Sequence, residues 1–178
     1  MDLKGSKTLQ NLLATFAGES QARLKYSFFA NVARREGYEQ IGGIFDETSD
    51  NEKEHAKSAF RFAGLEGTTV ENLLTAIEGE HEEHSELYKE FGRIAREEGF
   101  EEIAVFFQEV SEVEEAHEKR FQALRERVVA GTVFVREEED TLWHCRNCGY
   151  VHEGPEAPDS CPCCHHPKKF FEILPTNY

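Results

Sequence analysis

Apolar residues recur with the spacing of a helix face over most of the first 130 positions. Ile41 and Phe45 begin a series with alternating steps of four and three, the spacing of a helix packed in a bundle. The same steps begin again at Ile103 and Phe107, 62 residues later, so the chain contains an internal repeat. Two further segments show similar stripes, and glycine-containing breaks separate the segments. The pattern predicts four helices that pack as a bundle.

Each of the four apolar stripes is interrupted at mid-length by acidic residues, and two also carry a histidine. These side chains are Glu19, Glu52, His55, Glu80, Glu83, Glu114 and His117. A carboxylate in a core is costly unless it is neutralised, paired or bound to a metal, and the stripes offer no basic partner. A Glu-x-x-His pair taken alone is more often a solvated surface pair. Because both pairs share the phase of an apolar stripe, the pattern instead favours a two-metal carboxylate site inside the bundle.

Tyrosines and further histidines lie close to these acids. Tyr26 and Tyr88 fall on or beside the stripes, about two helical turns from the nearest acidic positions. They are either ordinary core tyrosines or hydrogen-bond donors to a metal-bound carboxylate or peroxide. His81 and His84 are candidate spare ligands, but their run of charged neighbours is more typical of a solvated helix face.

The chain changes character near Gly131, where long helical patterns give way to short apolar runs with Cys, Pro and Gly. The apolar run at residues 170–174 predicts a strand. We therefore expect two domains, a helical one over residues 1–135 and a small one over residues 136–178.

Four of the five cysteines form two closely spaced pairs in the small domain, Cys145 with Cys148 and Cys161 with Cys164. Such pairs allow four thiolates to converge on one ion in a tetrahedral site. The spacing alone does not separate iron from zinc, and a structural zinc ribbon is the alternative. Cys163 is the surplus thiol, and an odd number of cysteines fits poorly with a disulfide framework.

Charge and hydropathy limit the possible partners. The chain has 35 acidic and 20 basic residues, a formal net charge of -15, which argues against nucleic acid or an anionic membrane surface as a partner. No apolar run approaches the roughly 20 residues that span a bilayer. Residues 1–13 lack the apolar core of a signal peptide, so a cytoplasmic location is expected.

The sequence resembles the rubrerythrin family over nearly its full length. The matching motifs are Ala17-Gly18-Glu19-Ser20-Gln21-Ala22, Glu52-Lys53-Glu54-His55-Ala56, Gly79-Glu80 through Glu83, Glu114-Glu115-Ala116-His117-Glu118, and Cys145-x-x-Cys148-Gly149-Tyr150 with Cys161-Pro162-x-Cys164. The resemblance implies a mainly α fold: a ferritin-like four-helix bundle with a non-haem di-iron centre, followed by a small rubredoxin-like domain with one iron in a four-cysteine site.

The resemblance also implies a function and roles for individual residues. Rubrerythrins reduce hydrogen peroxide to water in defence against oxidative stress, with electrons derived from NAD(P)H through an external donor, a rubredoxin or a reductase. By similarity, the seven Glu and His residues named above would bind the two irons, with Glu52 and Glu114 bridging them. Glu83 and His55 would exchange as ligands on reduction. Iron at the four cysteines would return electrons one at a time.

The link between the second and third predicted helices, at residues 64–69, is unusually short for a ferritin-like bundle. That link must climb roughly 33 Å along the bundle, whereas six residues reach about 20 Å. One solution keeps residues 64–75 mostly extended. The other packs the first helix pair of one chain with the second pair of another, in a domain-swapped homodimer. We expect the swap.

Two other functions compete with peroxide reduction. An iron-oxidising storage protein would share the bundle and carry a structural zinc ribbon, although storage needs a large hollow shell. A zinc-ribbon binding module is disfavoured by the net charge of -15.

Overall fold

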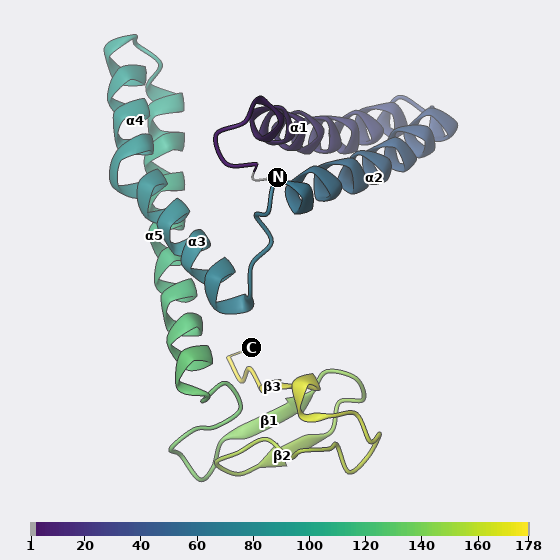
Figure 1. The fold of residues 1–178 in the computed structure, drawn as a ribbon, viewed down its shortest axis with the longest axis vertical. Helices are drawn as coiled ribbons and strands as arrows, with labels where there is room; N and C mark the ends of the chain where they lie inside the picture. Colours follow the sequence, from purple (N-terminus) through teal and green to yellow (C-terminus); the bar gives the residue numbers. More distant parts are fainter. Residues whose placement is uncertain (1–2, 178) are drawn as a thin grey trace. The chain divides into compact units, whose positions relative to one another are not determined.

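The computed structural model describes residues 3–177, which form helices followed by a small antiparallel sheet (Figure 1). The elements are α1 (Lys7–Arg35), α2 (Glu39–Phe62), α3 (Thr69–Glu82), the π-helical segment η1 (Glu83–Leu87), α4 (Tyr88–Glu97), α5 (Glu101–Ala130), β1 (Leu142–Cys145), β2 (Val151–Glu153), the 3-10 turn η2 (Lys168–Phe170) and β3 (Phe171–Ile173). The chain divides after Thr68 into two compact units, which are described separately below. Within the described residues, no helix has both the length and the apolar character needed to cross a membrane.

The first unit is a hairpin of α1 and α2, which run antiparallel (Figure 1). The turn between them depends on Gly37, whose φ of 88° lies in the left-handed region that favours glycine. This conformation lets the Tyr38 N–H donate to the Ala33 carbonyl at 2.8 Å, which satisfies one of the last carbonyls of α1.

The second unit begins with a hairpin of the same design, in which α3, η1 and α4 form one continuous helix that packs against α5 (Figure 1). Gly99 has a φ of 87°, and the Phe100 N–H donates to the Ala95 carbonyl at 2.8 Å. The four predicted helices are therefore confirmed, and the third contains a π-helical interruption that the apolar stripe did not predict.

Small residues let the two helices of each hairpin approach closely beside the turn. Ala30 on α1 and Ala104 on α5 are fully buried. A Cβ at Gly42 would lie 3.3 Å from the Ala30 carbonyl oxygen, and a Cβ at Gly92 would lie 3.5 Å from that of Ala104. Each hairpin thus pairs one alanine with one glycine, but on opposite helices.

The C-terminal part of the second unit holds the three strands in the order β2-β1-β3, all antiparallel (Figure 1). Trp143 on β1 is 1% exposed and donates from Nε1 to the Gly154 carbonyl at 2.9 Å. It packs with Phe171 and with two of the cysteines to form a small core. Strand β3 confirms the strand expected from the apolar run at residues 170–174.

Two sequence-based boundaries have different outcomes. Helix α5 ends at Ala130 and is capped by Gly131 with a φ of 69°, which matches the expected change of character. The division into domains at residue 135 stays a prediction.

The segment between the hairpins is shorter than one of the two expected solutions requires. Helix α2 ends at Phe62 and α3 begins at Thr69, so six residues lie between them. The alternative in which residues 64–75 are mostly extended is wrong, because helix formation from Thr69 satisfies the backbone hydrogen bonds of that stretch.

Candidate metal centres

The first hairpin brings three of the predicted ligands together. Glu19 on α1 and Glu52 and His55 on α2 each offer one ligand atom, and these atoms lie within 4.8 Å of one another. The three-residue spacing on α2 puts the Glu52 carboxylate 2.7 Å from Nδ1 of His55. The Glu52 side chain is 17% exposed, so it lies in a largely covered position.

The second hairpin repeats this arrangement. Glu80 on α3 and Glu114 and His117 on α5 also offer ligand atoms within 4.8 Å of one another. Nδ1 of His117 lies 2.7 Å from the Glu114 carboxylate and 3.8 Å from that of Glu80. Each hairpin therefore carries two carboxylates and one imidazole, a donor set suited to iron.

Electrostatics in the second hairpin also suit a cation. Burial raises the pKa of Glu80, and a hydrogen bond with the neighbouring Glu114 carboxyl raises it further. Two partly buried carboxylates in contact repel each other when both are ionised. A bound metal ion would remove this repulsion and compensate the lost hydration, so the residues present fit a metal.

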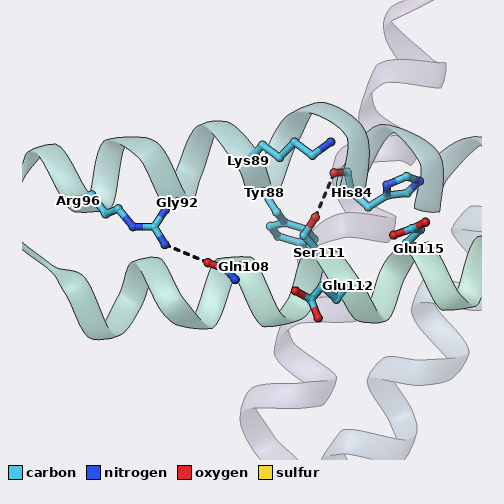
Figure 2. Close-up of a pocket in the computed structure, with 9 residues that line it drawn as sticks. All are labelled: His84, Tyr88, Lys89, Gly92, Arg96, Gln108, Ser111, Glu112 and Glu115. Carbon is cyan, nitrogen blue, oxygen red and sulfur yellow. Dashed lines mark hydrogen bonds between the residues drawn. The ribbon is translucent and has the colours of Figure 1, made fainter.

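Glu83, the one predicted di-iron ligand outside these two groups, lies at the start of the π-helical segment. The Tyr88 N–H donates to the Glu83 carbonyl, five residues earlier rather than four. Across the hairpin, the Ser111 hydroxyl donates to the His84 carbonyl at 3.0 Å (Figure 2). This contact from α5 supports the backbone where the helix changes register.

Tyr88 connects the π-helical segment to the ligands. Its hydroxyl donates to the Glu83 carboxylate at 3.4 Å, a long hydrogen bond, and its ring stacks on Phe107. Burial raises the pKa of Tyr88, and the Glu83 charge raises it further, so the phenol stays protonated. For Tyr26, the structure shows ring contacts with Phe29 and Phe45.

The sequence carries a signal of the π-helical segment that the stripe analysis missed. Glu19 and Glu80 are 61 residues apart, whereas Tyr26 and Tyr88 are 62 residues apart. The second copy of the repeat therefore holds one extra residue between these positions, which is what a π-helical turn accommodates.

His81 and His84, expected on a solvated face, share a partner on α5. The Glu118 carboxylate lies 2.6 Å from Nε2 of His84 and 3.3 Å from Nδ1 of His81. Only His81 is largely exposed, with 61% of its side chain accessible.

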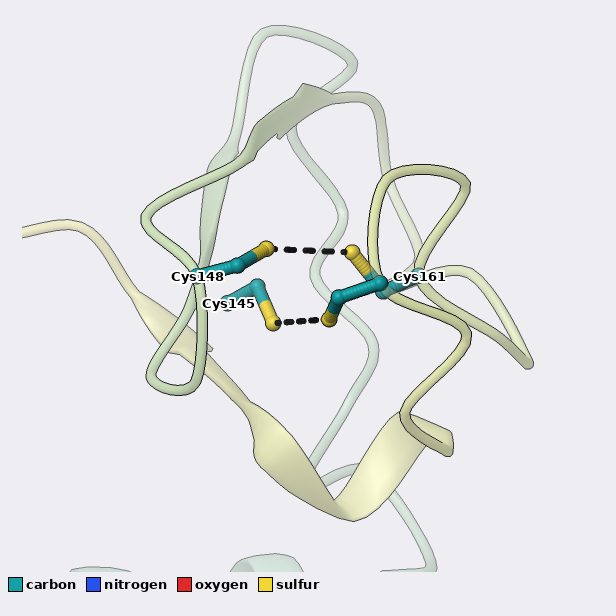
Figure 3. Close-up of side chains that lie close together, drawn as sticks. Cys145, Cys148 and Cys161 are labelled. Carbon is teal, nitrogen blue, oxygen red and sulfur yellow. Dashed lines mark hydrogen bonds between the residues drawn. The ribbon is translucent and has the colours of Figure 1, made fainter.

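The small domain brings the four predicted cysteines together (Figure 3). The Sγ atoms of Cys145 and Cys164 are 3.8 Å apart, and those of Cys148 and Cys161 are 3.6 Å apart. Four thiolates at about 2.3 Å from one tetrahedral ion would be separated by about 3.8 Å, so the sulfurs fit such an ion.

A backbone hydrogen bond favours the thiolate form of Cys164, the last of the four cysteines. A hydrogen bond from the His166 backbone lowers the pKa of Cys164 to about 6. His165, between Cys164 and His166, has a φ of 59°, a left-handed backbone conformation that residues other than glycine rarely adopt. Cys163 is exposed and belongs to none of the metal-ligand groups found among the described residues.

Two family models match the chain over the segments that hold these donor sets. The Rubrerythrin model matches residues 10–125, and the rubrerythrin, rubredoxin-like domain model matches residues 143–172. The chain belongs to the rubrerythrin family. The rubrerythrin of Porphyromonas gingivalis is 51% identical over 189 residues, which cover 99% of this chain and 94% of that protein. The rubrerythrin of Nitratidesulfovibrio vulgaris is 49% identical, covering 99% of this chain and 98% of that protein.

A solved structure of nigerythrin in a mixed-valence state is 31% identical and covers 94% of this chain and 86% of that one, with a TM-score of 0.35. In this chain the part that matches the Rubrerythrin model precedes the rubredoxin-like domain. The cofactors of the rubrerythrin family, a non-haem di-iron centre and one iron in a four-cysteine site, fit the donor sets described above.

Proposed function

We propose that this protein is a non-haem di-iron peroxidase that reduces hydrogen peroxide to water. The supporting observation is that both hairpins hold a Glu-x-x-His pair with a further glutamate, in a chain that also gathers four cysteines. Reduction breaks the O–O bond and consumes two electrons and two protons, which yields two waters. When bound, two ferrous ions supply one electron each.

The proposed ligands come from both hairpins and from the small domain. The di-iron ligands are Glu19, Glu52, His55, Glu80, Glu83, Glu114 and His117, with Glu52 and Glu114 as bridges. The ligands of the single iron are Cys145, Cys148, Cys161 and Cys164. Iron, rather than zinc, is proposed there because zinc has no redox chemistry with which to return electrons.

Glu83 and His55 are proposed as alternative ligands that exchange with oxidation state. A carboxylate suits the harder ferric ion, whereas a neutral imidazole suits the ferrous ion. The hydrogen bond from Tyr88 would hold the Glu83 carboxylate when it is not a ligand. Tyr88 and Tyr26 are both proposed to donate to groups at the centre, and Tyr88 has the direct support of that contact.

We further propose a domain-swapped homodimer, argued from chain length alone. In a ferritin-like bundle built from one chain, the link would have to span from Phe62 to Thr69. By helix rise these ends lie about 15 Å below and about 16 Å above the metal level. The seven peptide steps between them reach at most about 25 Å. Pairing the first hairpin of one chain with the second of another removes this conflict.

The remaining proposals concern the electron supply and the compartment. We propose an external donor, either a rubredoxin or a NAD(P)H-dependent reductase, that reduces the cysteine-bound iron. We also propose a cytoplasmic location, with no nucleic-acid or membrane partner, in keeping with the net charge of -15.

Metal analysis and single-turnover kinetics test the peroxidase proposal. The fully reduced protein is mixed anaerobically with stoichiometric hydrogen peroxide while the absorbance of the cysteine-bound iron is followed. Fast reoxidation, with iron at both kinds of site, is the expected result. Zinc at the cysteines, or reduced protein inert to peroxide, would contradict it and favour iron storage with a structural zinc ribbon. Gel filtration then distinguishes a dimer from a large shell.

A further inference from the structure

A second group of metal-ligating side chains lies on the second hairpin, outside the proposed di-iron ligands. His81, His84 and Glu118 each offer one ligand atom, and these atoms lie within 4.8 Å of one another. Both imidazoles point to one carboxylate, at 2.6 Å from His84 and 3.3 Å from His81. The centroids of the His81 and His84 rings are 5.2 Å apart and the rings are perpendicular, so neither ring covers the other's access to the Glu118 carboxylate.

The position of this group follows from helix geometry. His81, His84 and Glu118 each come directly after a proposed di-iron ligand in the sequence. Neighbouring residues on a helix differ by about 100° in direction, so the three side chains share the axial level of the di-iron ligands but occupy the adjacent face. Figure 2 shows His84 beside Glu115 on α5.

We propose that His81, His84 and Glu118 form a separate binding site for a divalent first-row transition-metal ion. Two imidazoles with one carboxylate is a common ligand set for Zn²⁺ and Fe²⁺. Ligand atoms at about 2.0–2.1 Å from a tetrahedral ion are about 3.3 Å apart, which is the observed separation of His81 and Glu118. His84 and Glu118 need to separate by about 0.7 Å, which exchanges a hydrogen bond for two metal bonds.

Exposure gives this site a different character from the di-iron ligands. The side chains of His84 and Glu118 are 15% and 13% exposed, so packing holds them in place. His81 is 61% exposed and leaves one side of the site open to water. The site therefore offers three protein ligands with water completing the coordination, and its ion exchanges with the solvent. The proposal is independent of the peroxidase activity.

Zinc binding to the iron-loaded, air-oxidised protein tests the proposal, because zinc is redox-inert and the di-iron and four-cysteine sites are already filled. Equilibrium dialysis against Zn²⁺, followed by measurement of both metals, should give one zinc per chain with no loss of iron. His84→Ala and Glu118→Gln should weaken this binding at least tenfold. His152→Gln, which removes an imidazole from strand β2, is the matched control and should bind zinc normally.

Two further measurements keep the test decisive. If His84→Ala or Glu118→Gln loses iron, His81→Gln is used in its place. The His81 side chain is exposed, so its replacement should disturb packing little. Copper(II) bound at the site should show electron-spin coupling to two imidazole nitrogens in the original protein and to one in His81→Gln. The proposal would be overturned if zinc bound only by displacing iron. It would also be overturned if the variants at His81, His84 and Glu118 all bound the additional zinc as tightly as the original protein.

Discussion

The two helical hairpins of this rubrerythrin-family protein share one design, but the first helix of the second hairpin contains an inserted residue. Both turn through a left-handed glycine, both pair alanine with glycine beside the turn, and both bring a Glu-x-x-His pair next to a glutamate from the other helix. The second hairpin holds one extra residue, which forms a π-helical turn at Glu83. At the matching position, 61 residues earlier, the first hairpin has Ala22.

Under the proposed function, this difference would separate metal binding, shared by both hairpins, from ligand exchange, assigned to the second. Metal holding needs carboxylates and imidazoles at fixed spacing, and both hairpins supply these. The proposed ligand exchange would need an additional group that can move. Among the described residues of the two hairpins, Glu83 with its hydrogen-bonded Tyr88 is the candidate for this role. Single π-helical turns inside α-helices are frequent at functional sites, and this one begins at Glu83.

The largest effect is expected from removing either of the two carboxylates that we propose as bridging ligands, one in each hairpin. Glu114→Ala and Glu52→Ala should each lose both irons of the di-iron centre and keep the cysteine-bound iron, because the remaining half-site would have one carboxylate fewer. Peroxide reduction by the reduced protein should fall at least about 100-fold. Metal analysis and stopped-flow absorbance measure the two effects.

Glu54→Gln is the control for this prediction, because Glu54 is exposed on α2 and pairs with Lys57. It should keep its iron and its rate. If either Glu52→Ala or Glu114→Ala lost one iron and kept the other, this would show that each hairpin binds metal on its own.

A smaller effect is expected when the second hairpin is made to resemble the first at the position of Glu83. Glu83→Ala should retain the irons but slow peroxide reduction about 10- to 100-fold, because it removes the carboxylate that we propose to exchange as a ligand. Anaerobic single-turnover kinetics measure the rate. Glu82→Gln, which changes an exposed neighbour, should have no effect. An unchanged rate in Glu83→Ala would mean that the two hairpins are functionally equivalent.

The tyrosines allow a finer comparison. Tyr88→Phe removes the hydrogen bond to Glu83 and should slow the reaction about tenfold. Tyr26→Phe should have a smaller effect, since this ring contacts Phe29 and Phe45 and the position that matches Glu83 in the first hairpin is Ala22, which has no carboxylate to accept a hydrogen bond. The same single-turnover assay compares the two variants, and equal effects would argue against a special role for the π-helical segment.

The smallest expected effects concern stability. Gly92→Ala should raise the free energy of unfolding by up to about 1 kcal/mol, because alanine favours the helix and the new Cβ meets the Ala104 oxygen at 3.5 Å, an ordinary contact. Gly42→Ala should gain nothing or lose about 1 kcal/mol. Its Cβ would lie 2.9 Å from Cγ of Arg34 and 3.3 Å from the Ala30 oxygen.

Urea unfolding of the two glycine variants, at equal iron content, checks this difference. Equal gains in stability would mean that the helices of the first hairpin can move apart at no cost.

Much of the architecture followed from local patterns in the sequence. The stripes that begin at Ile41 and Ile103 predicted helices because side chains three and four residues apart lie on one face whatever surrounds the helix. The cysteine spacing predicted a four-thiolate site, since the two cysteines of each pair are close enough in the chain to reach one ion, although the meeting of the two pairs depends on the fold. The resemblance to rubrerythrins rested on the same short motifs.

Other features were decided by contacts between residues that are distant in the sequence. The π-helical turn at Glu83 is supported by Ser111 on another helix. The joint contact of His81 and His84 with Glu118 required α5 to lie beside α3. Local periodicity determines which way a side chain points from its own helix, whereas only packing determines which side chain it meets.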